Sequence, residues 1–177
     1  PEAILMCELK STDSHQLLRQ TNLLIDDLNA SQLSYANPVL KDDEVQKAFE
    51  LRKAGLGLLG NMIGDKKAVA CIEDTAVALE DLSAYISEFS SLMDKYHQKP
   101  VYYAHAGAGE LHLRPILNLK KQGDVKLFRE ITTKTAKLVK KYGGSFSGEH
   151  GDGIVRAEFI PMMIGFFYFI YIYWTTP

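Results

Sequence analysis

The chain has 177 residues and a mass of 19.8 kDa, the size of about one domain. Its 46% apolar and 24% charged residues are ordinary for a globular domain, which excludes disordered, collagen-like and coiled-coil proteins. Lys and Arg number 20 against 22 Asp and Glu, a formal net charge of −2, so the charge balance does not favour a nucleic-acid partner. Cys7 and Cys71 cannot build a disulfide framework or a cysteine metal site, and we expect both to be buried apolar side chains in a reducing compartment.

The first third of the chain is expected to alternate between strands and helices. An apolar run predicts a strand over residues 3–9, and the polar cluster at 11–14 is suited to start a helix. A weaker strand is expected over residues 32–39 and a helix from Asp43. Four glycines between residues 55 and 64 predict a loop after that helix.

The middle of the chain gives stronger patterns. A fully apolar strand is expected over residues 68–72, and apolar side chains at helical spacing predict an amphipathic helix over 79–96. Strands at 101–104 and 111–116 flank a glycine turn, and a long helix follows over 128–142. This order predicts an α+β fold, with a ferredoxin-like sheet and helices packed on one face.

Both ends of the chain carry unusual segments. The first residue is not methionine and the first ten residues lack the basic start of a signal peptide, so we expect the chain to begin inside a longer protein. Residues 166–177 form an apolar tail of doubtful role, too short for a membrane helix and with the composition of an aggregation-prone strand. A buried terminal element, an interface segment and a tail foreign to the domain remain as alternatives.

Three of the five histidines lie in two glycine-rich segments, the first of which is HAGAGELH at residues 105–112. If the turn is centred between Ala108 and Gly109, His105 lies directly opposite His112, with the Cβ atoms about 4.5–5.5 Å apart. Two imidazoles so placed can bind one metal ion. The alternative is a glycine hairpin that carries two ordinary histidines.

The second segment is GGSFSGEHGDG at residues 143–153. Its five glycines cost chain entropy, so we expect its backbone to approach another group closely. Glu149 would complete a set of two histidines and one carboxylate with open metal positions, and His150 would be free to act as a base. A solvated loop with a surface Glu–His pair is the alternative.

Glu73 and Asp74 are interpreted as strand-end charges, because consecutive side chains on a strand point to opposite faces.

These motifs, together with RKAGLGLL and IEDTAV upstream, closely resemble the C-terminal domain of FAD-linked oxidases. That family includes D-lactate and D-2-hydroxyglutarate dehydrogenases and the flavin subunit of glycolate oxidase. The resemblance covers most of residues 42–165 and is greatest to long bacterial members with an additional iron–sulfur module. It implies that residues 1–165 form a ferredoxin-like cap domain over the flavin of a separate FAD-binding domain, which this chain does not contain.

The resemblance also implies roles for single residues. His105 and His112 match the two metal-ligating histidines of the family, and Glu149 matches its carboxylate ligand. His150 matches the histidine that takes the proton of the substrate hydroxyl. Arg52 matches the arginine that binds the substrate carboxylate.

Two observations qualify this correspondence. Arg52 continues the apolar stripe of its helix, which suits either a bidentate carboxylate contact or an arginine at the rim of the core. Ala108 and Glu110 stand where the family usually has Asp and Asn.

The function implied is that of a fragment, inactive alone, of a flavin-dependent oxidoreductase that oxidises a 2-hydroxy acid to the 2-oxo acid by hydride transfer to FAD. The missing domain would hold most of the FAD, and this chain would bind a divalent metal, expected to be zinc. Electrons would pass to an iron–sulfur partner or a membrane carrier. We expect the full-length protein in the cytoplasm, with peripheral attachment to the inner membrane as the alternative. The rival interpretations are a small metal-dependent hydrolase and a non-enzymatic metal-binding module.

Overall fold

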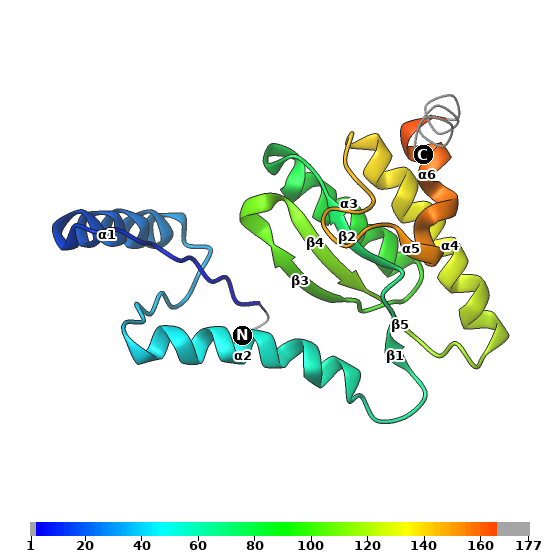
Figure 1. The fold of residues 1–177 in the computed structure, drawn as a ribbon, viewed down its shortest axis with the longest axis horizontal. Helices are drawn as coiled ribbons and strands as arrows, with labels where there is room; N and C mark the ends of the chain where they lie inside the picture. The colour runs from blue at the N-terminus through cyan, green and yellow to red at the C-terminus, as the bar shows by residue number, and fades with distance from the viewer. Residues whose placement is uncertain (1–2, 166–177) are drawn as a thin grey trace, which may run out of the picture. The chain divides into compact units, whose positions relative to one another are not determined.

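The computed structural model describes residues 3–165, so the predicted apolar tail at 166–177 lies outside the described residues. The chain divides into two compact units, residues 1–52 and 53–177 (Figure 1). Within the described part of the chain, no helix is both long and apolar enough to cross a membrane.

Two helices form within the first 60 residues, α1 (Ser14–Ser31) and α2 (Asp43–Gly60). Asp13 caps α1, as the polar cluster predicts, because its side chain accepts a 2.8 Å hydrogen bond from the backbone N–H of His15. The loop predicted from Gly55 onward is wrong in its first part, since α2 continues to Gly60. A glycine costs a helix only about 1 kcal/mol relative to alanine, which the helix-forming residues around it can outweigh.

The strands predicted over residues 3–9 and 32–39 are also wrong, because the structure assigns neither segment to a strand. Ile4 and Leu5 are largely exposed instead of packed. The apolar composition is a local signal, whereas a strand needs a partner to complete its hydrogen bonds. Cys7 is likewise exposed, contrary to prediction, whereas Cys71 is buried as predicted.

The second unit is organised around a three-stranded antiparallel sheet with the order β2-β4-β3. Its strands are β2 (Ile72–Ala76), β3 (Val101–His105) and β4 (Glu110–Arg114). A separate two-stranded ladder pairs β1 (Lys67–Ala68) with β5 (Ile116–Leu117). The strand predicted over residues 68–72 is therefore two strands, and β2 continues through the charged pair that was expected to end it.

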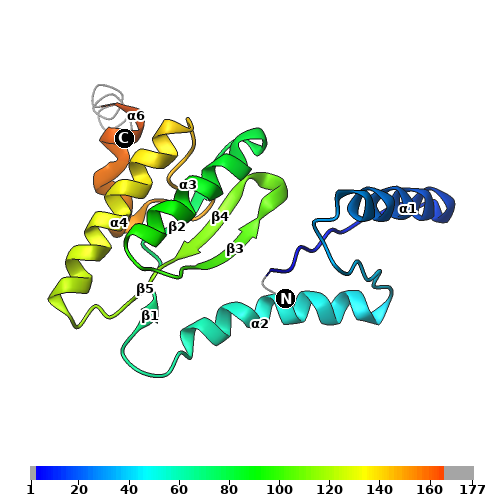
Figure 2. The same ribbon diagram turned by 180° about the vertical axis from the view of Figure 1, so that it is seen from behind.

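Helices α3 (Leu82–Lys95) and α4 (Gln122–Lys141) cover one face of this sheet (Figures 1 and 2). The order β2-α3-β3-β4-α4 is that of a ferredoxin-like fold. After α4, Ser145 forms an antiparallel bridge to Ala76 at the free edge of β2, in place of a fourth strand. The predicted α+β fold is confirmed. Short helical segments complete the unit: η1 (Leu79–Asp81), η2 (Ala106–Ala108), α5 (Gly153–Arg156), η3 (Ala157–Phe159) and α6 (Ile160–Ile164).

The hydrophobic core lies between the three-stranded sheet and helices α3 and α4. Its buried side chains come from one face of each element and include Ile72, Leu111, Leu113, Tyr85, Phe89, Met93, Ile131 and Val139. Full burial of such a side chain contributes about 1.5–3 kcal/mol. The buried hydroxyl of Tyr85 is satisfied, since it donates a 3.0 Å hydrogen bond to Thr75 Oγ1. Because side chains alternate along a strand, the other face of the sheet presents a different set of residues.

Candidate metal centre

The sheet face turned away from α3 and α4 carries polar side chains. On β4, Glu110 and His112 alternate with the core residues Leu111 and Leu113 and therefore point to this second face. His105, the last residue of β3, pairs directly with Glu110, so its side chain lies on the same face.

The hairpin between β3 and β4 turns one residue earlier in the chain than the sequence suggests. The turn occupies residues 106–109, so Tyr103, and not His105, is the partner of His112. This shift of two residues leaves every side chain on its predicted face. The two histidines are therefore diagonal neighbours, with ring centroids 5.3 Å apart.

Glycines hold both glycine-rich segments close to β2. A Cβ atom on Gly109 would lie 2.0 Å from the carbonyl oxygen of Val77, and one on Gly144 would lie 2.3 Å from that of Ala76. Next to Gly144, Ser145 and Ala76 exchange two backbone hydrogen bonds of 2.9 Å. The close backbone approach predicted for the second segment is therefore present, and the group approached is the strand β2.

Asp74 fixes the part of the loop that carries Glu149 and His150. It lies at an irregularity in the β2–β4 register, with φ 80°, and is fully buried. Its carboxylate accepts hydrogen bonds from Ser147 Oγ at 2.7 Å and from the backbone N–H groups of Glu149 at 2.9 Å and His150 at 3.0 Å. The interpretation of Asp74 as a strand-end charge misses this role.

The charge of Asp74 is stabilised inside the protein. Burial raises the pKa of its carboxyl group, but the hydrogen bonds from Ser147, Glu149 and His150 outweigh burial and lower the pKa to about 2. The buried guanidinium of Arg156 lies 3.5 Å from Asp74 and also donates to the backbone carbonyl of Gly151. An ionised Asp74 therefore orders the loop at neutral pH.

Four side chains converge beside this loop. One potential ligand atom each of His105, Glu110, His112 and Glu149 lies within 4.8 Å of the others. Two of the buried polar atoms, Glu110 Oε1 and His112 Nδ1, have no hydrogen-bond partner in the described part of the chain. Imidazole nitrogens and carboxylate oxygens are ligands that zinc prefers, so this donor set fits a divalent metal.

The electrostatics of the cluster agree with such a site. Burial, followed by the neighbouring His105 and His150, lowers the pKa of His112 and favours the neutral imidazole that binds metals. Burial, followed by a hydrogen bond with Asp74 and by the charge of Glu149, raises the pKa of Glu110 to about 7. The sequence interpretation gives Glu110 no place in this cluster, although its position two residues before His112 on a strand is a signal that could have revealed it.

His150 lies at the exposed side of the cluster, with 46% of its side chain accessible. Its ring stacks on His112, with centroids 5.3 Å apart and an interplanar angle of 10°. Nδ1 is 3.5 Å from Glu73 Oε1, and Nε2 is 3.1 Å from Glu149 Oε1. Glu73 in turn pairs with Arg114. An imidazole held between two carboxylates and open to solvent is suited to accept a proton.

Arg52 belongs to the first compact unit, where it is half-buried on α2. The other predicted site residues belong to the second unit. The contact of Arg52 with a substrate carboxylate stays a prediction.

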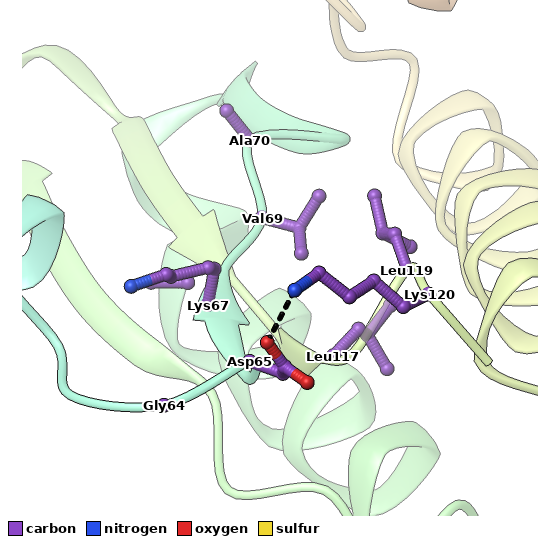
Figure 3. Close-up of a pocket in the computed structure, with 9 residues that line it drawn as sticks. Gly64, Asp65, Lys67, Val69, Ala70, Leu117, Leu119 and Lys120 are labelled. Carbon is purple, nitrogen blue, oxygen red and sulfur yellow. Dashed lines mark hydrogen bonds and ion pairs between the residues drawn. The ribbon is translucent and has the colours of Figure 1, made fainter.

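An open pocket in the second unit lies apart from these residues (Figure 3). Its lining consists of Gly64, Asp65, Lys67, Ala68, Val69, Ala70, Leu117, Leu119 and Lys120. Lys120 Nζ and Asp65 Oδ1 form a 2.6 Å ion pair there. None of the predicted site residues lines this pocket, so the histidine cluster is the better candidate for chemistry.

Comparison with known proteins places these motifs in context. A model of the family described as "FAD linked oxidases, C-terminal domain" matches residues 1–166. D-2-hydroxyglutarate dehydrogenase of Haemophilus influenzae is 43% identical over 110 residues, which are 62% of this chain and 11% of that protein. The enzyme of the same name from Pseudomonas putida is 39% identical over 126 residues, 71% of this chain and 12% of that protein. Glycolate oxidase subunit GlcD of Bacillus subtilis is 24% identical over 127 residues, 70% of this chain and 25% of that protein.

Proposed function

Because the chain belongs to the family of FAD linked oxidases through their C-terminal domain, we propose that it is the substrate-side part of a flavin-dependent 2-hydroxy acid dehydrogenase. The family match confirms the resemblance of the motifs. The chain spans only 11–12% of the length of the D-2-hydroxyglutarate dehydrogenases that it matches. The proposal therefore concerns a longer parent protein that supplies an FAD-binding domain.

The observation that supports the proposal most is the convergence of the predicted ligands beside His150. His105, His112 and Glu149 would hold a divalent metal, which we propose to be zinc. When bound, such a metal would act as a Lewis acid that makes the substrate hydroxyl more acidic.

The residues of this chain would move the proton. His150 would accept it from the hydroxyl group, and Glu73, 3.5 Å from Nδ1, would stabilise the imidazolium that forms. FAD, held mainly by the parent's other domain, would accept the hydride from Cα, so that the products are the 2-oxo acid, reduced flavin and a protonated His150.

Arg52 is proposed to bind the substrate carboxylate, because a planar guanidinium matches a carboxylate in a bidentate contact. The substrate would be a small 2-hydroxy acid of the D-2-hydroxyglutarate, D-lactate or glycolate type. We further propose an iron–sulfur module as electron acceptor, and a location in the cytoplasm or peripherally at the inner membrane.

Replacement of His150 in the parent enzyme tests the proposal. His150→Asn keeps the polarity of the loop but removes the base, so kcat should fall by about 10²–10⁴-fold while KM changes much less. Glu149→Gln should lower metal content first and activity as a consequence. Stopped-flow measurement of flavin reduction and elemental analysis check both expectations. If neither variant slows flavin reduction, the loop has no part in the chemistry and the proposal is wrong.

A further inference from the structure

Glu110 lies among the three predicted ligands without having a predicted role. It is directly opposite His105 in the β3–β4 register and two residues before His112 on the same strand face. One of its carboxylate oxygens is within 4.8 Å of a ligand atom of each of His105, His112 and Glu149.

The carboxyl group of Glu110 is buried and only partly satisfied, since it shares a hydrogen bond with Asp74 but one of its oxygens has no partner among the described residues. The residue is 7% exposed, and Oε1 has no hydrogen-bond partner in the described part of the chain. A buried polar atom without a partner costs about 1–3 kcal/mol, and more when the group is charged. Asp74, which shares a hydrogen bond with the Glu110 carboxyl group, and the charge of Glu149 both disfavour a negative charge on Glu110. A cation at this point would remove the penalty.

The loop after α4 leaves room for the Glu110 carboxylate on its side of the cluster. A Cβ atom on Gly148 would lie 2.9 Å from Glu110 Oε1 and 3.2 Å from Cδ. Any other residue at position 148 would therefore displace the Glu110 carboxylate. Two segments that are distant in sequence, β4 and the loop after α4, thus leave space for an acidic group beside the histidines.

From these observations we propose that Glu110 is a fourth protein ligand of the metal, so that the centre consists of two histidines and two carboxylates. The inference rests on the proposed metal site at His105, His112 and Glu149. It adds that the protein itself supplies a second negative charge, which neutralises a divalent ion in full. Fewer positions at the metal then remain for substrate than a set of three ligands would leave.

Zinc titration of the 177-residue chain tests the assignment. Glu110→Gln keeps the size of the side chain but replaces the carboxylate with a poor zinc ligand. We expect its zinc affinity to fall at least about 100-fold, the upper end of the loss that follows removal of a group that only orients a ligand. Glu80→Gln, the same change at an exposed position of η1, is the matched control and should bind as the wild type does.

A second variant separates the ligand from the general integrity of the site. Gly148→Ala leaves the charge of Glu110 in place but forces its carboxylate to move, and we expect a loss of zinc affinity in the same direction. Without metal, Glu110→Gln should be at least as stable as the wild type, because it removes a buried carboxylate that Asp74 and Glu149 disfavour. The rise in Tm that zinc causes in the wild type should be nearly absent in this variant.

Cobalt(II) in place of zinc reports the ligands directly, since its visible absorption depends on their number and kind. A changed cobalt spectrum in Glu110→Gln supports direct ligation. If Glu110→Gln and Gly148→Ala keep the zinc affinity and cobalt spectrum of the wild type while His105→Ala, His112→Ala binds nothing, Glu110 is not a ligand but the metal site stands. If the wild-type chain binds no zinc, the proposed site fails and this inference fails with it.

Discussion

The two faces of the three-stranded sheet use the same backbone for different purposes. On β4, Leu111 and Leu113 pack against α3 and α4, whereas Glu110 and His112, which alternate with them, belong to the candidate metal centre. The apolar face stabilises the fold and keeps the strands in register. The polar face gains its geometry from that register but leaves two buried polar atoms without partners among residues 3–165, so it costs stability in the absence of metal. Substitutions on the apolar face should therefore lower the stability of the fold, whereas substitutions on the polar face should lower the metal affinity.

The largest loss of stability is expected from the apolar face. Phe89 is fully buried on α3, and Phe89→Ala should reduce the free energy of unfolding by about 3–5 kcal/mol. The zinc affinity of the folded protein should not change, since Phe89 does not belong to the cluster. Chemical denaturation and zinc titration below the unfolding transition measure the two effects. If Phe89→Ala also lowers the zinc affinity of the folded protein, the two faces of the sheet do not act separately.

Asp74 is the exception that should affect both properties. Asp74→Ala removes the acceptor of three loop hydrogen bonds and the charge partner of Arg156, so we expect a loss of about 2–3 kcal/mol. Zinc affinity should fall too, because Glu149 loses the bond that holds its backbone. Ser147→Ala removes one of the three bonds and should cost only about 1 kcal/mol. Unchanged zinc binding in Asp74→Ala would contradict the proposed anchoring of the loop.

Glycine substitutions should separate close backbone contact from simple flexibility. Gly144→Ala places a Cβ atom 2.3 Å from a backbone oxygen that cannot easily move, and we expect a loss of about 1–3 kcal/mol. Gly55 lies in α2, where an added Cβ atom would meet no described atom within 4 Å beyond its chain neighbours and the nearby backbone of its own helix, so Gly55→Ala should instead stabilise the helix by about 1 kcal/mol. Thermal denaturation of both variants checks the opposite signs. If Gly144→Ala stabilises the protein as Gly55→Ala does, the loop has no tight contact with β2.

The smallest effect on stability is expected at the exposed histidine of the cluster. His105→Ala should change the free energy of unfolding by less than about 0.5 kcal/mol, as is usual for an exposed side chain. Its zinc affinity should nevertheless fall sharply, because one ligand is lost. His15→Ala, in the first turn of α1, should alter neither property and serves as the control. A His105→Ala variant that still binds zinc tightly would exclude this residue from the ligands.

The helices with a periodic apolar pattern are the elements that the sequence predicts best. Apolar spacing predicts α3 and α4, and the two glycine segments point to the region of the candidate site. The hairpin register is wrong by two residues because it depends on the length of the turn, which spacing alone does not determine. Asp74 is missed because its partners lie 73–76 residues further along the chain and because the bulge interrupts strand alternation. The segment at residues 3–9 has the composition of a strand but no strand to pair with among the described residues.

Residues 73–77 connect both halves of the candidate site, and this governs how the site can move. Glu73 pairs with His112 in the sheet register, and Asp74 binds the loop that carries Glu149. At the end of the same segment, the N–H of Val77 donates to the carbonyl of residue 109 at 3.0 Å. Any motion that separates the backbone of this loop from the histidines must therefore break the buried hydrogen bonds that the Asp74 carboxylate accepts from it. Opening of the site should accordingly follow the slow exchange of sub-global unfolding, in the range of milliseconds or longer, and not the nanosecond motion of an exposed loop.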